Sequence, residues 1–225
     1  MSEGCQHLFV IWREPDEGRR HVIGELWQDH EGFAFGYGHD VEAARARGFS
    51  LLVELPAYRP VSDPYRSSYL FSTFAQRIPS PKRPDYKDIL ESWGVTAPDS
   101  PLDILARSGG VQLTDRIEVD EYRSADDALE IPLLFRVAGE EHYPGSSIVE
   151  VGEELQLVRE PTNDYDANAV MVQKSDGTKL GYVPRQYSEL VARLVGQGLA
   201  LHPVAERRLV TSNDRARWIV KISRH

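Results

Sequence analysis

The sequence has a single cysteine, Cys5, among its 225 residues. One thiol excludes an internal disulfide framework and every zinc site built from several cysteines. The sequence also lacks an apolar run of about 18 residues, so we expect no transmembrane helix. Its first residues show no basic region followed by an apolar core, and a secretory signal is therefore not expected. These absences predict a protein of the reducing cytoplasm.

Positive charge is also scarce. The net charge is −9, whereas domains that coat DNA are usually basic. Residues 1–130 contain 14 basic and 23 acidic side chains and carry the whole excess, while residues 131–225 contain 12 of each. Residues 185–225 hold 8 basic and 3 acidic side chains. The acidity belongs to the front half, and the back half can tolerate a polyanion.

No constellation of catalytic or metal-binding residues is visible. The histidines are scattered without the close spacing of metal ligands, and no serine lies in a strand–turn–helix elbow. Gly109 and Gly110 end a helical pattern, whereas phosphate cradling needs the start of a helix. We expect a non-catalytic protein with no metal and no cofactor; a metal-dependent enzyme is the weakest alternative.

Apolar runs and helical patterns alternate in the front half, which predicts an α+β domain over residues 1–117. Residues 56–68, rich in proline and serine, are expected to be a loop. The acidic, weakly patterned residues 118–130 are interpreted as a linker. The predicted strands are 8–12, 21–27, 33–37 and 51–55, and the predicted helices are 41–48, one beginning near Tyr69, 85–93 and 101–108.

The back half, residues 131–225, combines many short strands with one helix, which favours a small β-barrel. Ser175-Asp176-Gly177-Thr178 predicts a tight hairpin turn, and residues 211–214 predict the turn of a last hairpin. The predicted strands are 131–137, 154–158, 169–173, 179–183, 200–209 and 218–223, with a helix over 187–199.

The most informative window runs from Arg159 to Val170, between two of these strands. Turn chemistry explains its proline, asparagine and aspartate residues. It does not explain Tyr165 or Arg159. A stacking face, a cation and hydrogen-bonding groups together suit the end of a single nucleic-acid strand.

A purely structural interpretation stays open for each of these residues. Asn163 and Asp166 are able to satisfy their own backbone in a turn. Arg159 is able to pair with Glu160 or Asp166, and such surface pairs contribute about 0–1 kcal/mol. Tyr182, in Gly-Tyr-Val-Pro, is interpreted as a packing residue at a strand end.

Four motifs in the back half occur in the order of a known family. They are Arg136-Val137-Ala138-Gly139, the block from Arg159 to Val170, Asp176-Gly177, and Gly181-Tyr182-Val183-Pro184-Arg185. With them the chain resembles the HIRAN domain, which stands at the N-terminus of helicase-like DNA-repair remodelers and also occurs alone in bacteria. The resemblance implies an OB-like barrel with flanking helices. In the helicase-borne members it also implies capture of the 3′-hydroxyl end of single-stranded DNA.

The resemblance assigns roles to particular residues. Asn163 and Asp166 match positions that bind the terminal sugar and its 3′-hydroxyl, and Tyr165 matches an aromatic on the end nucleotide. The family pattern has an Arg-Tyr pair where this chain has Glu141-His142, and an acid beside a phosphate is repulsive. The complete predicted nucleic-acid site is Tyr143, Arg159, Asn163, Tyr165, Asp166, Asn168, Tyr182 and Arg185, with Tyr143 stacking, Tyr182 at the pocket rim, and Arg159 and Arg185 meeting phosphate.

The front half is similar, more loosely, to the small N-terminal subdomain of HipA-type toxin kinases. The similarity lies in the order and spacing of segments such as 21–26, 33–37, 51–56, 69–74 and 101–106. The kinase body that would follow is absent, so no kinase activity is implied. We expect a bacterial-type nucleic-acid-binding protein of DNA repair or of a toxin–antitoxin system, binding single-stranded or 3′-ended DNA. The alternative is a regulator that docks a toxin kinase or repair enzyme through its acidic half, without binding DNA.

Overall fold

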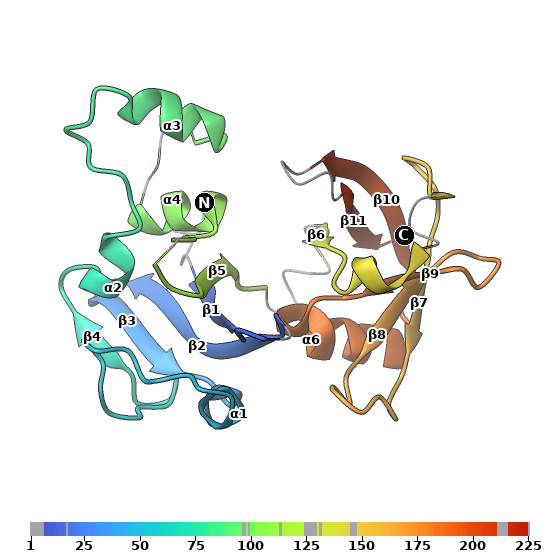
Figure 1. Ribbon diagram of the computed structural model, residues 1–225, viewed down its shortest axis with the longest axis horizontal. Coiled ribbons are helices and arrows are strands. Elements are labelled where there is room, and N and C mark those ends of the chain that lie inside the picture. Colours follow the sequence, from blue (N-terminus) through green and yellow to red (C-terminus); the bar gives the residue numbers. More distant parts are fainter. Residues whose placement is uncertain are drawn as a thin grey trace. The chain divides into compact units, whose positions relative to one another are not determined.

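The computed structural model describes residues 7–16, 18–95, 98, 100–112, 114–123, 130, 132–144, 148–210 and 216–224. The chain forms two compact units that divide between Tyr122 and Arg123 (Figure 1). Both units combine antiparallel sheets with a small share of helix, and the predicted α+β class is confirmed. Among the described helices, none is long and apolar enough to cross a membrane.

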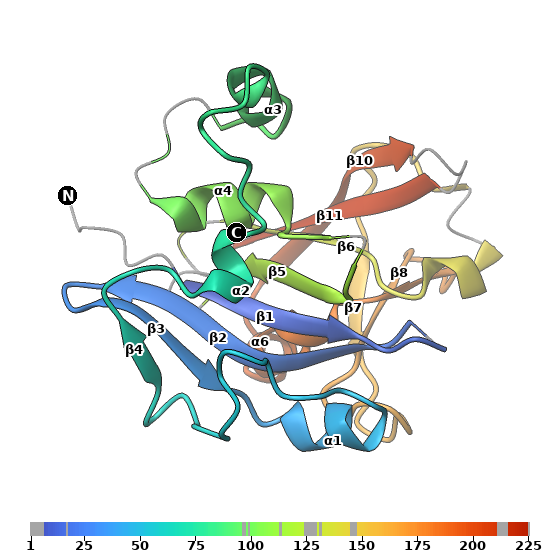
Figure 2. The ribbon, with the colours of Figure 1, turned by 60° about the vertical axis from the view of Figure 1, so that its left-hand side comes forward.

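The first unit is built on one five-stranded antiparallel sheet in the order β4-β3-β2-β1-β5. Alternate strand residues such as Leu8 and Val10 point to one face and join the main core, as the two-residue period of a strand requires. The helix α4 lies over this face beside β5 and β1 (Figure 2). The elements are β1 His7–Arg13, β2 Arg20–Asp29, β3 Gly32–Tyr37, α1 Val41–Ala46, β4 Tyr65–Ser67, α2 Ser72–Ala75, α3 Tyr86–Ser92, α4 Pro101–Ser108 and β5 Ile117–Glu121.

Local signals fixed α4 at the predicted bounds. The side-chain oxygen of Ser100 accepts from the backbone of Leu102, and Asp103 accepts from the backbone of Ser100, which forms a capping box. Pro101 occupies the first helical position, where its missing N–H costs nothing. Gly109 ends the helix with φ 74°, a left-handed conformation that glycine adopts without strain.

The predicted buried strand at 51–55 is wrong. Residues 53–55 form a turn instead, with Leu52 and Leu55 buried and Val53 97% exposed. The buried hydroxyl of Tyr37 accepts from the backbone N of Leu52 at 2.9 Å and donates to the carbonyl of Leu55 at 2.7 Å. Burial raises the pKa of Tyr37 to about 12, which keeps this hydroxyl protonated. The apolar run therefore wraps a tyrosine rather than pairing with a strand.

Three other predictions need correction at their boundaries. The predicted loop 56–68 contains the edge strand β4, which pairs with β3. The helix expected near Tyr69 begins at Ser72 and leaves Tyr69 exposed. The predicted linker 118–130 is a strand in its first part, because β5 pairs with β1 from Ile117 to Glu121. Its acidic residues alternate with buried Ile117 and Val119, which is a half-buried strand pattern.

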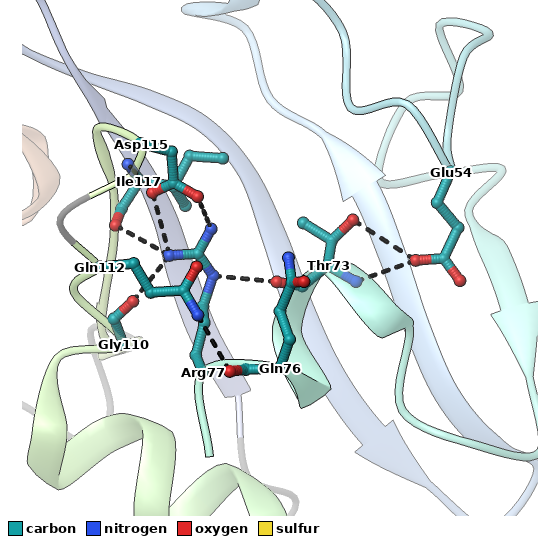
Figure 3. A network of polar contacts seen from close by, with 8 residues as sticks. All are labelled: Glu54, Thr73, Gln76, Arg77, Gly110, Gln112, Asp115 and Ile117. Carbon is teal, nitrogen blue, oxygen red and sulfur yellow. Dashed lines mark hydrogen bonds and ion pairs between the residues drawn. The ribbon is translucent and has the colours of Figure 1, made fainter. Parts of the chain in front are cut away.

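A buried arginine joins separate parts of the first unit (Figure 3). The side chain of Arg77 is 1% exposed. Its Nε donates to the carbonyl of Thr73 at 2.9 Å, and its Nη1 donates to the carbonyl of Gly110 at 2.8 Å and to Oδ1 of Asp115 at 3.1 Å. A second contact joins Nη2 to Oδ2 of the same aspartate. The guanidinium thus links α2, the end of α4 and the segment before β5.

The second unit contains two three-stranded antiparallel sheets, β10-β11-β6 and β7-β8-β9. Single bridges join the sheets at Ala138–Tyr182 and at Glu154–Val204. The helix α6 packs on β7 and β8 (Figure 1). The elements are β6 Leu133–Arg136, η1 Glu140–His142, β7 Gln156–Arg159, β8 Val170–Gln173, β9 Lys179–Tyr182, α6 Arg185–Gly196, β10 Leu201–Val210 and β11 Ala216–Arg224.

Local patterns predicted this unit closely. The tight turn at 175–178 is present, with Gly177 at φ 85° and Thr178 donating its backbone N–H to Asp176. The helix begins at Arg185, two residues before the predicted start. The predicted turn of the last hairpin, residues 211–214, lies outside the described residues.

Candidate nucleic-acid interface

The loop between β7 and β8 is a ten-residue hairpin loop with a fixed internal structure. Its base is closed by the backbone hydrogen bond from Glu160 N to Ala169 O, 2.8 Å. Oδ1 of Asn163 accepts from the backbone N of Tyr165 at 3.0 Å and of Asp166 at 3.3 Å. Oδ1 of Asp166 accepts from the backbone N of Asn168 at 2.8 Å. The asparagine and aspartate therefore act as turn-forming residues, as the structural interpretation expected.

Tyr182 is the centre of a side-chain network beneath this loop. Its hydroxyl donates to Oε2 of Glu160 at 2.8 Å and accepts from Nδ2 of Asn163 at 3.4 Å. Tyr143 reaches the same hydroxyl at 3.5 Å, and the two rings meet edge to face with centroids 6.1 Å apart. Tyr182 therefore does more than the predicted packing at a strand end. Its hydroxyl connects β9 to the loop between β7 and β8 and to the segment that carries Tyr143.

The network holds a negative charge at its centre. Burial alone would raise the pKa of Glu160, but hydrogen bonds from Tyr182 and Asn163 and the charge of Lys179 outweigh it and lower this pKa. The pKa of Tyr182 is raised by burial, by the hydrogen bond with Tyr143 and by Glu160. At neutral pH the carboxylate is ionised and the phenol is protonated, which fixes the direction of the bond between them.

A second network ties the loop to α6. Oδ1 of Asp166 lies 2.7 Å from Nη1 of Arg185, and Oδ2 accepts from the hydroxyl of Ser188 at 2.7 Å. The N-cap residue of α6, Pro184, supplies no side-chain cap. The carboxylate of Asp166 therefore stands at the first turn of the helix, where the helix dipole favours a negative charge.

Glycine at position 181 lets the segment that leads to Tyr143 approach the strand β9 closely. Gly181 has φ 143°, and a Cβ there would lie 2.4 Å from the carbonyl oxygen of Ala138. Next to it, Ala138 and Tyr182 exchange two backbone hydrogen bonds of 2.8 Å. This bridge holds the segment that leads to Tyr143 against the strand that carries Tyr182.

The structure brings most of the predicted site residues together. Tyr143, Asn163 and Tyr182 share one network, and Asp166 and Arg185 share the other. Asn163 joins the two through the backbone of Asp166. Tyr165 and Asn168 lie on the same loop.

Tyr165 and Asn168 differ in how much they offer to a ligand. The side chain of Tyr165 is 73% exposed, whereas Asn168 is half-buried. Glu141 and His142, which replace the Arg-Tyr pair of the family pattern, are both exposed on η1 directly before Tyr143. The exposed groups directly before Tyr143 are thus one acid and one imidazole.

Arg159 lies apart from the other site residues. A Cβ added to Gly196 would be 3.0 Å from its Nη1, so the guanidinium lies against the last turn of α6. Arg185 is the first residue of that helix, so Arg185 and Gly196 lie about 16 Å apart along the helix axis. Of the two acids that the sequence offered to Arg159, Glu160 pairs with Lys179 and Asp166 pairs with Arg185.

Three contributors escaped the sequence reasoning. Glu160 and Lys179 were not assigned to the site, although their ends lie 3.6 Å apart beside Tyr182. Ser188 follows Arg185 by three residues, a spacing that places both on one helix face. The position of Ser188 could therefore have been predicted from the sequence, whereas the position of Lys179 beside Glu160 depends on strand pairing. In the described part of the chain no group of His, Cys, Asp or Glu side chains is arranged to hold a metal ion.

Comparison with known proteins places the back half in a family. The family model of the HIRAN domain matches residues 133–222, and the predicted HIRAN domain is confirmed. The chain is 30% identical over 93 residues to the helicase-like transcription factor of Mus musculus and to that of Oryctolagus cuniculus. The match covers 40% of this chain and 9% of each relative, so it concerns one domain of much longer proteins.

Two solved structures are similar to part of the chain. One is the crystal structure of the HIRAN domain of human HLTF, with 23% identity and a TM-score of 0.35 over 40% of this chain and 72% of that chain. The other is a protein from Lactobacillus plantarum, with 25% identity and a TM-score of 0.33 over 42% of this chain and 100% of that chain. The similarity of residues 1–117 to HipA-type kinases stays a prediction.

Proposed function

We propose that the second unit binds nucleic acid without catalysis and prefers a single-stranded or 3′-ended DNA. The observation that carries the proposal is the loop of a HIRAN domain in which Tyr165 is 73% exposed while its neighbours Asn163 and Asp166 are held by internal hydrogen bonds. A rigid loop that presents an aromatic ring to solvent pays little entropy when a base stacks on it.

The charges around the loop favour a sugar end without phosphate. Glu160 is ionised and Asp166 is already paired, so a terminal phosphate beside them would meet two carboxylates. A 3′-hydroxyl would instead meet hydrogen-bond acceptors. Arg185 contacts this loop through Asp166, and it would reach a ligand phosphate by leaving that carboxylate. Arg159 lies at the other end of α6 and serves a more distant phosphate.

We also infer that the strands of this unit close into the OB-like barrel. The bridge at Ala138 continues β6 toward β9, and the bridge at Glu154 continues β7 toward β10. With these two links every strand has a neighbour on both sides. An OB fold binds oligonucleotides on one face of its barrel and through the loops beside that face.

The test is fluorescence anisotropy with single strands that carry either a free or a phosphorylated 3′ end. We expect tighter binding of the free end, and binding that weakens as salt rises. Equal affinity for both strands would contradict end recognition, and no binding at low salt would contradict the proposed function as a whole.

A protein-docking role is the second candidate, and one observation favours it. Residues 1–130 carry the whole net charge of −9, and Glu141 adds an exposed acid directly before Tyr143. Such a surface suits a basic protein partner. Recovery of one specific protein by the full chain, together with no DNA binding at any salt concentration, would decide for this role.

A further inference from the structure

A buried carboxylate takes part in the strand pairing of the second unit. The strand β6 pairs with β11 as far as Arg136 and Ile219. At the next position Val137 donates its backbone N–H to the carbonyl of Trp218 at 3.0 Å. The backbone N of Trp218 donates instead to Oε2 of Glu140 at 2.9 Å. The carboxylate thus serves as the acceptor that the facing strand supplies in a regular antiparallel ladder.

The hydrogen bond between Glu140 and Trp218 is enclosed by the protein. Glu140 is 5% exposed and Trp218 is 2% exposed. Burying a carboxylate costs free energy unless it accepts hydrogen bonds, and a buried backbone N–H is costly without an acceptor. One bond offsets part of both costs. It therefore holds Glu140 firmly on β11.

Glu140 is also the first residue of η1, the short helix that leads to Tyr143. Gly139, with φ 70°, precedes the helix in a left-handed conformation. The backbone N of Tyr143 donates to the carbonyl of Glu140 at 3.0 Å. Beyond this turn the ring of Tyr143 meets Tyr182 edge to face. Glu140 thus contacts β11 with its side chain and Tyr143 with its main chain.

We propose that Glu140 is a positioning residue of the candidate nucleic-acid interface, and that it places Tyr143 by holding η1 on β11. The inference rests on the proposed function, in which Tyr143 stacks on the bound strand. Because its carboxylate is buried against β11, Glu140 acts through Tyr143 and not on the ligand. The exposed residues Glu141 and His142 belong to the same turn, so Glu140 fixes their place as well.

The first test compares Glu140→Ala with Glu140→Gln in the full chain. The side-chain carbonyl of glutamine can accept from Trp218 as the carboxylate does, whereas alanine removes this acceptor. Fluorescence anisotropy should show weaker binding of a single strand with a free 3′ end in Glu140→Ala. The loss should not exceed that in Tyr143→Ala, which is about 5- to 150-fold for one stacked base.

Glu140→Gln should bind like the unchanged chain. The matched control is Glu150→Ala, which removes an exposed carboxylate of the same unit and should also leave binding unchanged. Equal losses in Glu140→Ala and Glu150→Ala would overturn the proposal, since the change of charge alone would then explain them. An equal loss in Glu140→Gln would overturn it too, because the acceptor is still present in that variant.

A double-variant cycle separates positioning from general stability. Glu140→Ala should have no further effect on affinity in a chain that already carries Tyr143→Ala. It should keep its full effect in a chain that carries Tyr165→Ala, since Tyr165 lies on another loop. Additive losses in both backgrounds would contradict a role through Tyr143, because a loosened unit weakens binding in either one.

A second measurement needs no ligand. NMR of labelled tyrosine rings in the free chain reports the contact of Tyr143 with Tyr182. The Tyr143 resonances should shift in Glu140→Ala and stay in place in Glu140→Gln. Unchanged resonances in Glu140→Ala would overturn the inference, even where binding is lost.

The NMR result also separates this inference from the proposed function. Failure of the unchanged chain to bind any single strand would refute the proposed function, while a shift of Tyr143 in Glu140→Ala would still support its positioning by Glu140. Should Glu140→Ala fail to fold, Glu140→Asp replaces it in every test. Its side chain is one methylene shorter, which draws the carboxylate back from Trp218.

Discussion

Asp166 and Arg185 form an ion pair in which the carboxylate Oδ1 lies 2.7 Å from Nη1 of the guanidinium. The resemblance matches the aspartate to the sugar end of a ligand, and the predicted site gives the arginine to phosphate. In the structure they contact each other. Binding of the proposed ligand by both residues would therefore compete with this ion pair.

Replacing Asp166 should cost stability as well as binding. Asp166→Ala removes the carboxylate that accepts from the hydroxyl of Ser188 and the backbone N of Asn168 and that pairs with Arg185. We expect a loss of about 2–3 kcal/mol in the free energy of unfolding, mostly from the two hydrogen bonds, because a partly exposed ion pair contributes little. Urea denaturation measures it. The exposed neighbour Asp164 is the control, and an equal effect in Asp164→Ala would contradict this account.

Tyr165→Ala should weaken single-strand binding without changing stability. The ring is 73% exposed, so its removal opens no cavity. Stacking of one base on an aromatic side chain contributes about 1–3 kcal/mol, and we expect affinity for a 3′-ended strand to fall by about 5- to 150-fold. Anisotropy gives the affinity and thermal unfolding gives the stability. Tyr165→Phe should bind like the unchanged chain; equal losses in both variants would argue against stacking.

Tyr182→Phe should make acid denaturation less steep. The hydroxyl of Tyr182 helps to lower the pKa of Glu160 below its ordinary value of 4.5. A carboxyl with a lowered folded-state pKa stabilises the fold above its ordinary pKa, and this contribution is lost as the pH falls through the folded-state value. The gap in stability between the unchanged chain and Tyr182→Phe should therefore be largest at pH 7 and shrink below about pH 4.5.

Urea denaturation at a series of pH values measures that gap, and carboxyl NMR follows Glu160 directly. The control is Tyr58→Phe in the first unit, a half-exposed tyrosine that stacks on Tyr37. A gap that stays constant from pH 7 to pH 3 would show that Tyr182 does not act through Glu160.

Arg77→Met should destabilise the first unit. The variant removes the donor that Arg77 supplies to the carbonyls of Thr73 and Gly110, and it leaves the carboxylate of Asp115 without its cation (Figure 3). Removing one member of a buried pair costs about 3–5 kcal/mol. Arg83→Met is the control, because the Arg83–Asp85 pair is half-exposed on both sides and should leave stability unchanged. Denaturation followed by tryptophan fluorescence compares them, and similar midpoints for the two variants would refute the prediction.

Gly181→Ala should push the segment that leads to Tyr143 away from the strand β9, which carries Tyr182, and so destabilise the proposed interface. A Cβ at this position meets the carbonyl oxygen of Ala138 at 2.4 Å, and φ is 143°. Gly177 also has a positive φ, 85°, but nothing lies within 4 Å of a Cβ there. Gly177→Ala should cost about 1–2 kcal/mol from backbone strain alone, and Gly181→Ala should cost more. Equal losses would mean that the Ala138–Tyr182 bridge tolerates the side chain.

Features that depend on neighbouring residues could be predicted from the sequence. The helix from Pro101 to Ser108 follows from its capping box and C-terminal glycine, and the turn at 175–178 follows from Asp-Gly. The turn chemistry of Asn163 and Asp166 was also readable. The prediction failed at 51–55, because an apolar run does not reveal that Tyr37, 15 residues before Leu52 and 18 before Leu55, will take its backbone hydrogen bonds.

The sequence by itself determined that the back half carries a HIRAN domain and that the segment from Arg159 to Val170 is a turn-rich loop with an aromatic in it. Only the tertiary structure decided which charges meet. Strand pairing places Tyr182 and Lys179 beside Glu160. The packing of α6 places Arg185 on Asp166, and it places the last turn of the helix, at Gly196, against Arg159. These partners lie about twenty or more residues apart, and contacts at that separation follow from how the elements pack rather than from any local pattern.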